Sequence, residues 1–146
     1  MKQIICIIFI LGNLLLGAQN LVPNGSFEIL SSCPTGGTHS STLCVNWYNP
    51  TQAGTPDAYS VCGGDVPSNG VYYQWPRTGN SFAGIWCYTN AFTNLREYLH
   101  TNLNNTLIVN NYYLIKFYTT LNDWSKYACN NLGLYFSNSA IYQSGA

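Results

Sequence analysis

The chain has 146 residues, enough for one domain, and equal numbers of basic and acidic residues. Only 7% of its residues are charged and 15% are aromatic, a composition that is not one of disorder. The absence of a basic run argues against nucleic acid as a partner. Abundant Tyr, Asn, Thr, Ser and Gly are typical of β-rich extracellular domains.

Residues 1–19 have the pattern of a signal peptide. Lys2 precedes an apolar run from Ile4 to Leu16, and small or polar residues follow it. The run is shorter than the roughly 20 residues of a membrane span, and a buried N-terminal helix is the alternative. We expect cleavage after Ala18 or Gln19, a secreted or cell-surface location and no membrane span in the mature chain. Disulfides are expected in that oxidising compartment.

The segment "NLVPNGSFE" opens the mature chain and predicts a first strand over 21–30, with a bulge at Pro23-Asn24-Gly25. A two-residue period predicts further strands. Over 95–103 a strand is favoured over a helix, which the spacing of Leu95 and Leu99 also allows. The expected later strands cover residues 58–62, 81–88, 95–103, 112–121 and 131–137.

Many short strands, long loops and little helical period predict an all-β fold, an antiparallel β-sandwich or barrel. The mature module is expected over residues 20–146. The sequence stops soon after a strand, which would leave an unpaired strand edge. We therefore expect the module to be incomplete at its C-terminus.

An ordered set of segments carries a family resemblance. It consists of "NLVPNGSFE", Trp47, "GTPDAYSVC", "RTGNSFAGI", "LREYLHTNL", "YYLIKFYTTL" and "NNLGLYFS". The chain resembles the N-terminal jelly-roll modules of secreted and outer-membrane-associated bacterial proteins, often of the type IX secretion kind. These modules are similar to carbohydrate-binding, galactose-binding-domain-like sandwiches. The resemblance implies an antiparallel β-sandwich of jelly-roll type, followed by downstream domains of the same protein.

The resemblance also implies a Cys33–Cys62 bridge, because both cysteines match positions where such modules carry them. The state of Cys44, Cys87 and Cys129 stays open, since sequence alone does not choose among pairings. Related sandwiches often hold a structural Ca²⁺ near the first strand, and Glu28 matches that ligand position. The alternative is that Glu28 caps a loop through backbone N–H groups. No other cofactor is implied.

Catalytic patterns are weak in this sequence, so we expect a protein that is not an enzyme. His39 and His100 are the histidines, and no GxSxG or HExxH motif is present. A glycoside hydrolase would need a carboxylate pair, but the spacing joins no two acids. The acids of the mature chain are Glu28, Asp57, Asp65, Glu97 and Asp123. Arg96-Glu97 is expected to be a surface pair.

Aromatic residues are the candidate ligand-binding groups, because flat rings suit the apolar faces of sugars. The alternative for several rings is packing, and Trp47, Phe82 and Phe117 are expected in the core. We predict a non-catalytic surface module that binds a polysaccharide or surface glycan. The alternative is a structural or adhesive spacer that contacts protein or cell wall. The predicted binding residues are Tyr72, Tyr73, Trp75, Trp86 and Trp124.

Overall fold

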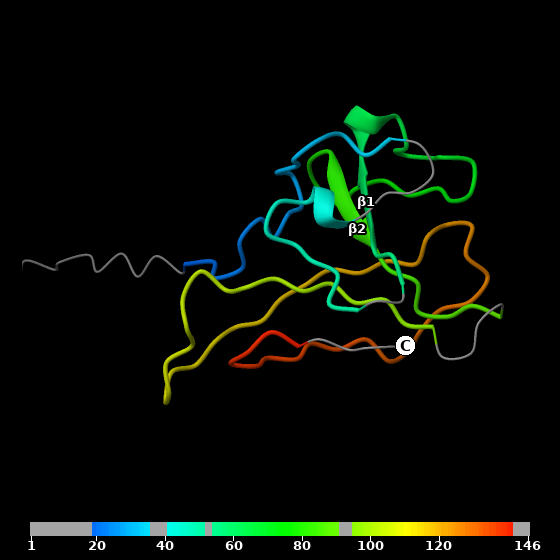
Figure 1. The fold of residues 1–146 in the computed structure, drawn as a ribbon. Helices are drawn as coiled ribbons and strands as arrows, with labels where there is room; N and C mark the ends of the chain where they lie inside the picture. Colours follow the sequence, from blue (N-terminus) through cyan, green and yellow to red (C-terminus); the bar gives the residue numbers. More distant parts are fainter. Residues whose placement is uncertain (1–18, 36–40, 52–53, 91–94, 142–146) are drawn as a thin grey trace, which may run out of the picture.

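The computed structural model describes residues 19–35, 41–51, 54–90 and 95–141. Apart from Gln19 the predicted signal peptide lies outside these residues, as does His39. Strands β1 (Asp57–Ser60) and β2 (Ser81–Gly84) form a two-stranded antiparallel sheet (Figure 1). Two short 3₁₀ turns, η1 (Ser41–Leu43) and η2 (Val61–Gly63), flank it. The described residues contain no α-helix, and none of their segments is a helix able to cross a membrane.

The β1–β2 ribbon forms the centre of the small core. Tyr59 lies opposite Phe82 in the register, and the two rings stack with centroids 4.9 Å apart. Cross-strand aromatic pairs of this kind stabilise a two-stranded ribbon beyond the area that they bury. Ala58 and Tyr59 are buried in β1. Phe82, predicted to be in the core, is half-buried on this pair.

Both strands are shorter than the sequence pattern predicts. The predicted strand over 58–62 ends at Ser60, because the Ser60 hydroxyl accepts a hydrogen bond from the Cys62 amide and caps η2. The predicted strand over 81–88 ends at Gly84. The Trp86 amide donates to a Glu97 carboxylate oxygen at 2.7 Å instead of to a neighbouring strand.

The first segment is a turn, and the prediction of a bulged strand over 21–30 is wrong. Asn24 and Phe27 have positive φ values of 46° and 63°. The Asn24 side chain binds both backbone groups of Ile29 and the carbonyl of Val45, and so ties the turn to the backbone hydrogen bond between Val45 and Ile29. The Phe27 ring packs on Trp47 at 4.8 Å. Trp47, predicted to be in the core, is half-buried.

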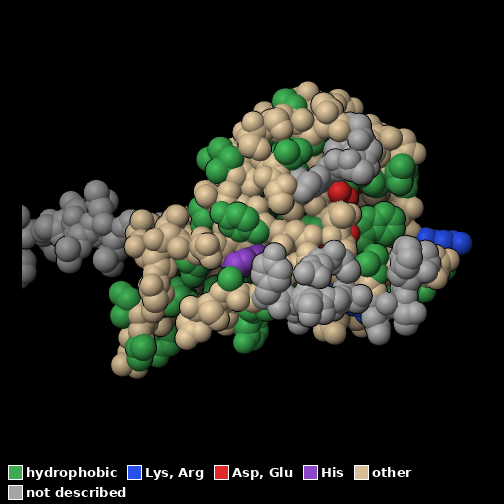
Figure 2. All heavy atoms as spheres, viewed as in Figure 1, with side chains coloured by type: hydrophobic (Ala, Val, Ile, Leu, Met, Phe, Trp, Pro, Cys, Tyr) green, Lys and Arg blue, Asp and Glu red, His purple; other side chains and the backbone are tan. Residues whose placement is uncertain are grey.

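Residues 95–141 are extended but form no ladder of paired strands. In the described part of 95–141 the backbone pairs with another segment as a β-bridge only at His100, which pairs with Tyr48. Figure 1 shows these residues as long stretches below the ribbon. Phe117, predicted in the core, is 52% exposed, and Leu114 on the opposite face is 93% exposed. A two-residue period indicates that side chains alternate between two faces of an extended chain. A face becomes buried only where another segment packs on it. Figure 2 shows hydrophobic side chains over the visible surface.

The Cys33–Cys62 disulfide is confirmed, with Cα atoms 5.7 Å apart. It fastens the loop after residue 30 to η2. Gly63 lies directly against the backbone carbonyl of Pro34, at a place where an added Cβ would overlap the Pro34 oxygen. The close approach of these two backbones therefore requires glycine.

Candidate functional site

Three of the predicted binding residues gather on the surface. We call Tyr73, Trp75 and Trp124 the aromatic cluster. The Trp75 indole N–H donates to the Tyr73 hydroxyl at 3.2 Å, and the Tyr73 and Trp124 ring centroids lie 6.1 Å apart. Trp75 and Trp124 are 55% and 56% exposed. Two segments far apart in sequence thus present indole and phenol surface at one place.

Hydrogen bonds to backbone groups hold the two segments of the aromatic cluster together. The Asn122 side-chain oxygen accepts from the amides of Tyr73 at 3.3 Å and of Trp124 at 2.9 Å. The Asp123 amide donates to the Tyr73 carbonyl at 3.2 Å. Asn122 is a positioning residue that sequence reasoning missed, because its partner lies 49 positions away.

Tyr72 is half-buried and packs against the core residue Tyr59 instead of joining the aromatic cluster. Its hydroxyl lies 2.6 Å from the Tyr59 hydroxyl, and the two rings meet edge to face at 4.9 Å. The Tyr59 hydroxyl also lies 3.0 Å from an Asp57 carboxylate oxygen. Burial, followed by its contacts with Tyr72 and Asp57, raises the pKa of Tyr59 far above its ordinary value. This phenol stays neutral and serves the packing.

Trp86 is 47% exposed but stands apart from the aromatic cluster. Within the described residues its ring makes no aromatic contact with Tyr73, Trp75 or Trp124. The five predicted binding residues therefore divide into a cluster of three, a tyrosine that packs against the core and a separate tryptophan.

Two carboxylates hold the ends of the β1–β2 ribbon. Glu28 accepts from the amides of Asn80 at 3.0 Å and Ser81 at 2.9 Å, where β2 begins. At the other end, Glu97 accepts from the Thr55 and Trp86 amides, each at 2.7 Å. Carboxylates that accept backbone N–H groups form strong, charge-assisted hydrogen bonds. Both side chains therefore position backbone.

Glu97 is 6% exposed, so the prediction of an Arg96-Glu97 surface pair is wrong. The Arg96 guanidinium binds the neighbouring Leu95 carbonyl instead. A charged carboxylate can be buried when hydrogen bonds replace its contacts with water. The Thr55 and Trp86 amides supply these hydrogen bonds to Glu97. Nothing in the local sequence distinguishes it from an exposed acid.

The contacts of Glu28 bear on its two predicted roles, calcium ligand and loop cap. Ca²⁺ needs six to eight oxygen ligands, but the Glu28 oxygens face backbone N–H donors. Among the described residues no three His, Cys, Asp or Glu side chains gather as a metal-binding group. Gly79, with a φ of 70°, lies directly against the Glu28 carboxylate. These contacts favour the alternative that Glu28 caps a loop.

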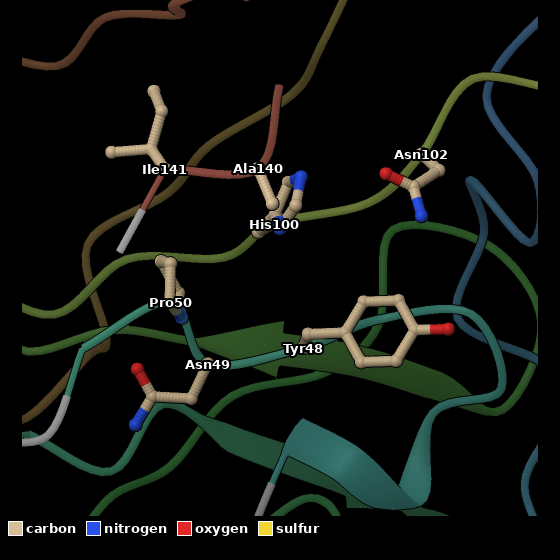
Figure 3. A pocket seen from close by; sticks show the side chains of 7 residues that line it. All are labelled: Tyr48, Asn49, Pro50, His100, Asn102, Ala140 and Ile141. Carbon is tan, nitrogen blue, oxygen red and sulfur yellow. The ribbon is translucent and has the colours of Figure 1, made fainter. Parts of the chain in front are cut away.

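A groove on another part of the surface has residues that the sequence did not indicate. It has a volume of about 310 Å³ and is lined from three segments, as Figure 3 shows. Tyr48 and Asn102 also line a neighbouring hollow of about 180 Å³. The Tyr48 and His100 rings lie 6.2 Å apart above reciprocal backbone hydrogen bonds. The lining residues of the larger groove are Tyr48, Asn49, Pro50, His100, Asn102, Ala140 and Ile141.

No family model, curated protein or solved structure matches this chain.

Proposed function

We propose that the chain is an exported, non-catalytic module of jelly-roll type that binds a glycan at the aromatic cluster. The observation that carries the proposal is the meeting of Tyr73, Trp75 and Trp124. Two of these rings are more than half exposed, and hydrogen bonds hold the two segments together. A fixed group of exposed rings loses little conformational entropy when it binds a ligand.

The chemistry of the cluster suits a sugar. Pyranose rings have apolar C–H faces and a polar hydroxyl edge, and aromatic rings with polar atoms complement both. The Tyr73 hydroxyl already accepts from the Trp75 indole, so it can donate its own proton to a ligand oxygen. The three side chains of the aromatic cluster are uncharged, and the ionised side chain beside them in the sequence, Asp123, is acidic, which favours a neutral glycan over an acidic one.

Two observations support export. Lys2 and the apolar run after it have the pattern of a signal peptide. The Cys33–Cys62 bridge suits an oxidising compartment. Attachment to downstream domains of a larger envelope protein is part of the same proposal.

The test is a glycan array probed with the full chain, with the Cys33–Cys62 bridge verified. Binding should appear on neutral glycans and disappear in the Tyr73→Ala/Trp75→Ala variant. Trp86→Ala is the matched control, because it removes an exposed indole outside the aromatic cluster. Absence of binding across the array would refute the proposal. Binding lost in Tyr48→Ala but kept in the cluster variant would move the site to the groove.

A structural or adhesive spacer is the second candidate. The specific observation is the exposure of large apolar side chains along 107–118, including Tyr112 and Leu114. Exposed apolar surface of this kind marks contacts with protein or other apolar partners. In a spacer, the Tyr73→Ala/Trp75→Ala variant would leave cell-surface attachment unchanged, whereas Tyr112→Ser/Leu114→Ser would weaken it.

A further inference from the structure

The cysteines outside the confirmed bridge fall into two kinds. Cys44 is 1% exposed, and its backbone pairs with Leu30. Burial raises the pKa of the Cys44 thiol to about 11, so it is protected from exchange. Cys87 is half-buried and Cys129 is exposed. Among the free cysteines of the described residues, these last two are therefore the more accessible to solvent.

Cys87 and Cys129 come from distant segments that meet in space. Tyr88 follows Cys87 directly and Tyr127 lies two residues before Cys129, and the two tyrosine rings make an edge-to-face contact at 5.9 Å. Burial raises the pKa of the Cys87 thiol, and the charge of Cys129 and a hydrogen bond with it raise that pKa further. The two thiols are therefore neighbours. A disulfide needs cysteines that converge at short range, and the contact between the Tyr88 and Tyr127 rings brings the segments of these two cysteines together.

We propose that Cys87 and Cys129 form a second disulfide when the chain meets an oxidising compartment. This bridge would tie the extended stretch around Cys129 to the chain that follows β2. It would also restrain the segment that includes Trp124. Formation of this bridge does not depend on glycan binding.

The oxidant is a disulfide, either oxidised glutathione or the disulfide of an oxidase. The Cys129 thiol is the more exposed, so its thiolate attacks one sulfur of that disulfide and releases the other as a thiolate. The Cys87 thiolate then attacks the Cys129 sulfur of the mixed disulfide and releases the second oxidant thiolate. Two electrons pass to the oxidant, and its two thiolates take up the protons that the two cysteines lose.

Trypsin separates the relevant cysteines. Cleavage after Arg77, Arg96 and Lys126 places Cys87 in residues 78–96 and Cys129 in residues 127–146. Cys33, Cys44 and Cys62 stay together in an earlier peptide. A Cys87–Cys129 bridge therefore appears as two linked peptides, whereas the Cys33–Cys62 bridge closes a loop inside one peptide.

The experiment refolds the full chain with oxidised and reduced glutathione, blocks free thiols with an alkylating reagent, and maps tryptic peptides without reduction. The expected result is the linked pair 78–96/127–146 in molecules that also contain the Cys33–Cys62 loop. In Cys87→Ser the linked pair should vanish and Cys129 should become fully alkylated. Cys44→Ala is the matched control and should keep the linked pair.

The Cys33–Cys62 loop serves as the internal sign of correct folding. Alkylation of both Cys87 and Cys129 in molecules that contain this loop would overturn the proposal. A link from either cysteine to the peptide that includes Cys44 would overturn it as well.

Discussion

Replacement of Glu97 by Ala is the sharpest test of how the β1–β2 ribbon is held. The side chain is 6% exposed and accepts two backbone hydrogen bonds of 2.7 Å, from Thr55 before β1 and Trp86 after β2. Removal of the carboxylate leaves both amides without their acceptor. The ribbon should therefore loosen at the end where Asp57 pairs with Gly84.

The expected loss follows from the two bonds. A hydrogen bond to a charged group contributes about 1.5–3 kcal/mol. Thr55 and Trp86 are exposed residues, so water can partly replace the lost acceptor. We therefore expect Glu97→Ala to lower the free energy of unfolding by about 2–4 kcal/mol, a large part of the roughly 5–15 kcal/mol that stabilises a domain. Glu97→Gln keeps one acceptor oxygen, so its loss should be smaller.

The assay is urea unfolding followed by tryptophan fluorescence, with the free energy extrapolated to water. Asp123→Asn is the matched control, because this carboxylate is exposed and its side chain has no hydrogen bond within the described residues. The control midpoint should not change. If Glu97→Ala changed the free energy by less than about 0.5 kcal/mol, the size of an ordinary surface substitution, the reasoning would be refuted.

Three further predictions concern the cysteines and one glycine. Loss of the Cys33–Cys62 bridge in a double serine variant should cost about 3–4 kcal/mol in urea unfolding, the chain-entropy value for its separation of 29 residues; an unchanged midpoint would contradict this. Gly63→Ala should lower the melting temperature by several degrees, since a Cβ there overlaps the Pro34 carbonyl. The matched control is Gly133→Ala, because the space around Gly133 is open. Gly64→Ala is unsuitable as a control because the φ of Gly64 is 80°. Burial raises the pKa of the Cys44 thiol from 9.0 to about 11. Between these pH values the unfolded chain loses a proton that the folded chain keeps, so stability should fall as pH rises. Cys44→Ala should show a shallower fall than the wild type, and equal slopes would contradict this.

Local sequence patterns predict the parts of the fold that depend on local chemistry. Strand β2 begins directly after the Thr78-Gly79-Asn80 turn, as the turn residues indicate. The non-helical class follows from the two-residue period, and the Cys33–Cys62 pairing from the family resemblance. Of the five predicted binding residues, Tyr73, Trp75 and Trp124 do gather at the surface.

The contacts that limit the strands could not be predicted, because they join distant positions. Glu28 binds an amide 52 residues away and Glu97 one 42 residues away. A backbone N–H donor has no residue signature, so neither acid differs in sequence from an exposed one. Likewise, the period of 112–121 indicates an extended chain, but whether it joins a sheet depends on a partner segment. The positive φ of Asn24 depends on its side-chain bonds to Ile29 and Val45.

The most direct test of the central claim is isothermal titration of one array-positive glycan into the full chain and two single variants. The account predicts that Trp75→Ala weakens binding at least tenfold, about the contribution of a central aromatic contact. Trp86→Ala, which removes an equally large but separate exposed ring, should leave the affinity unchanged. Equal effects of the two variants, or no effect of Trp75→Ala, would contradict the claim that the aromatic cluster is the binding site.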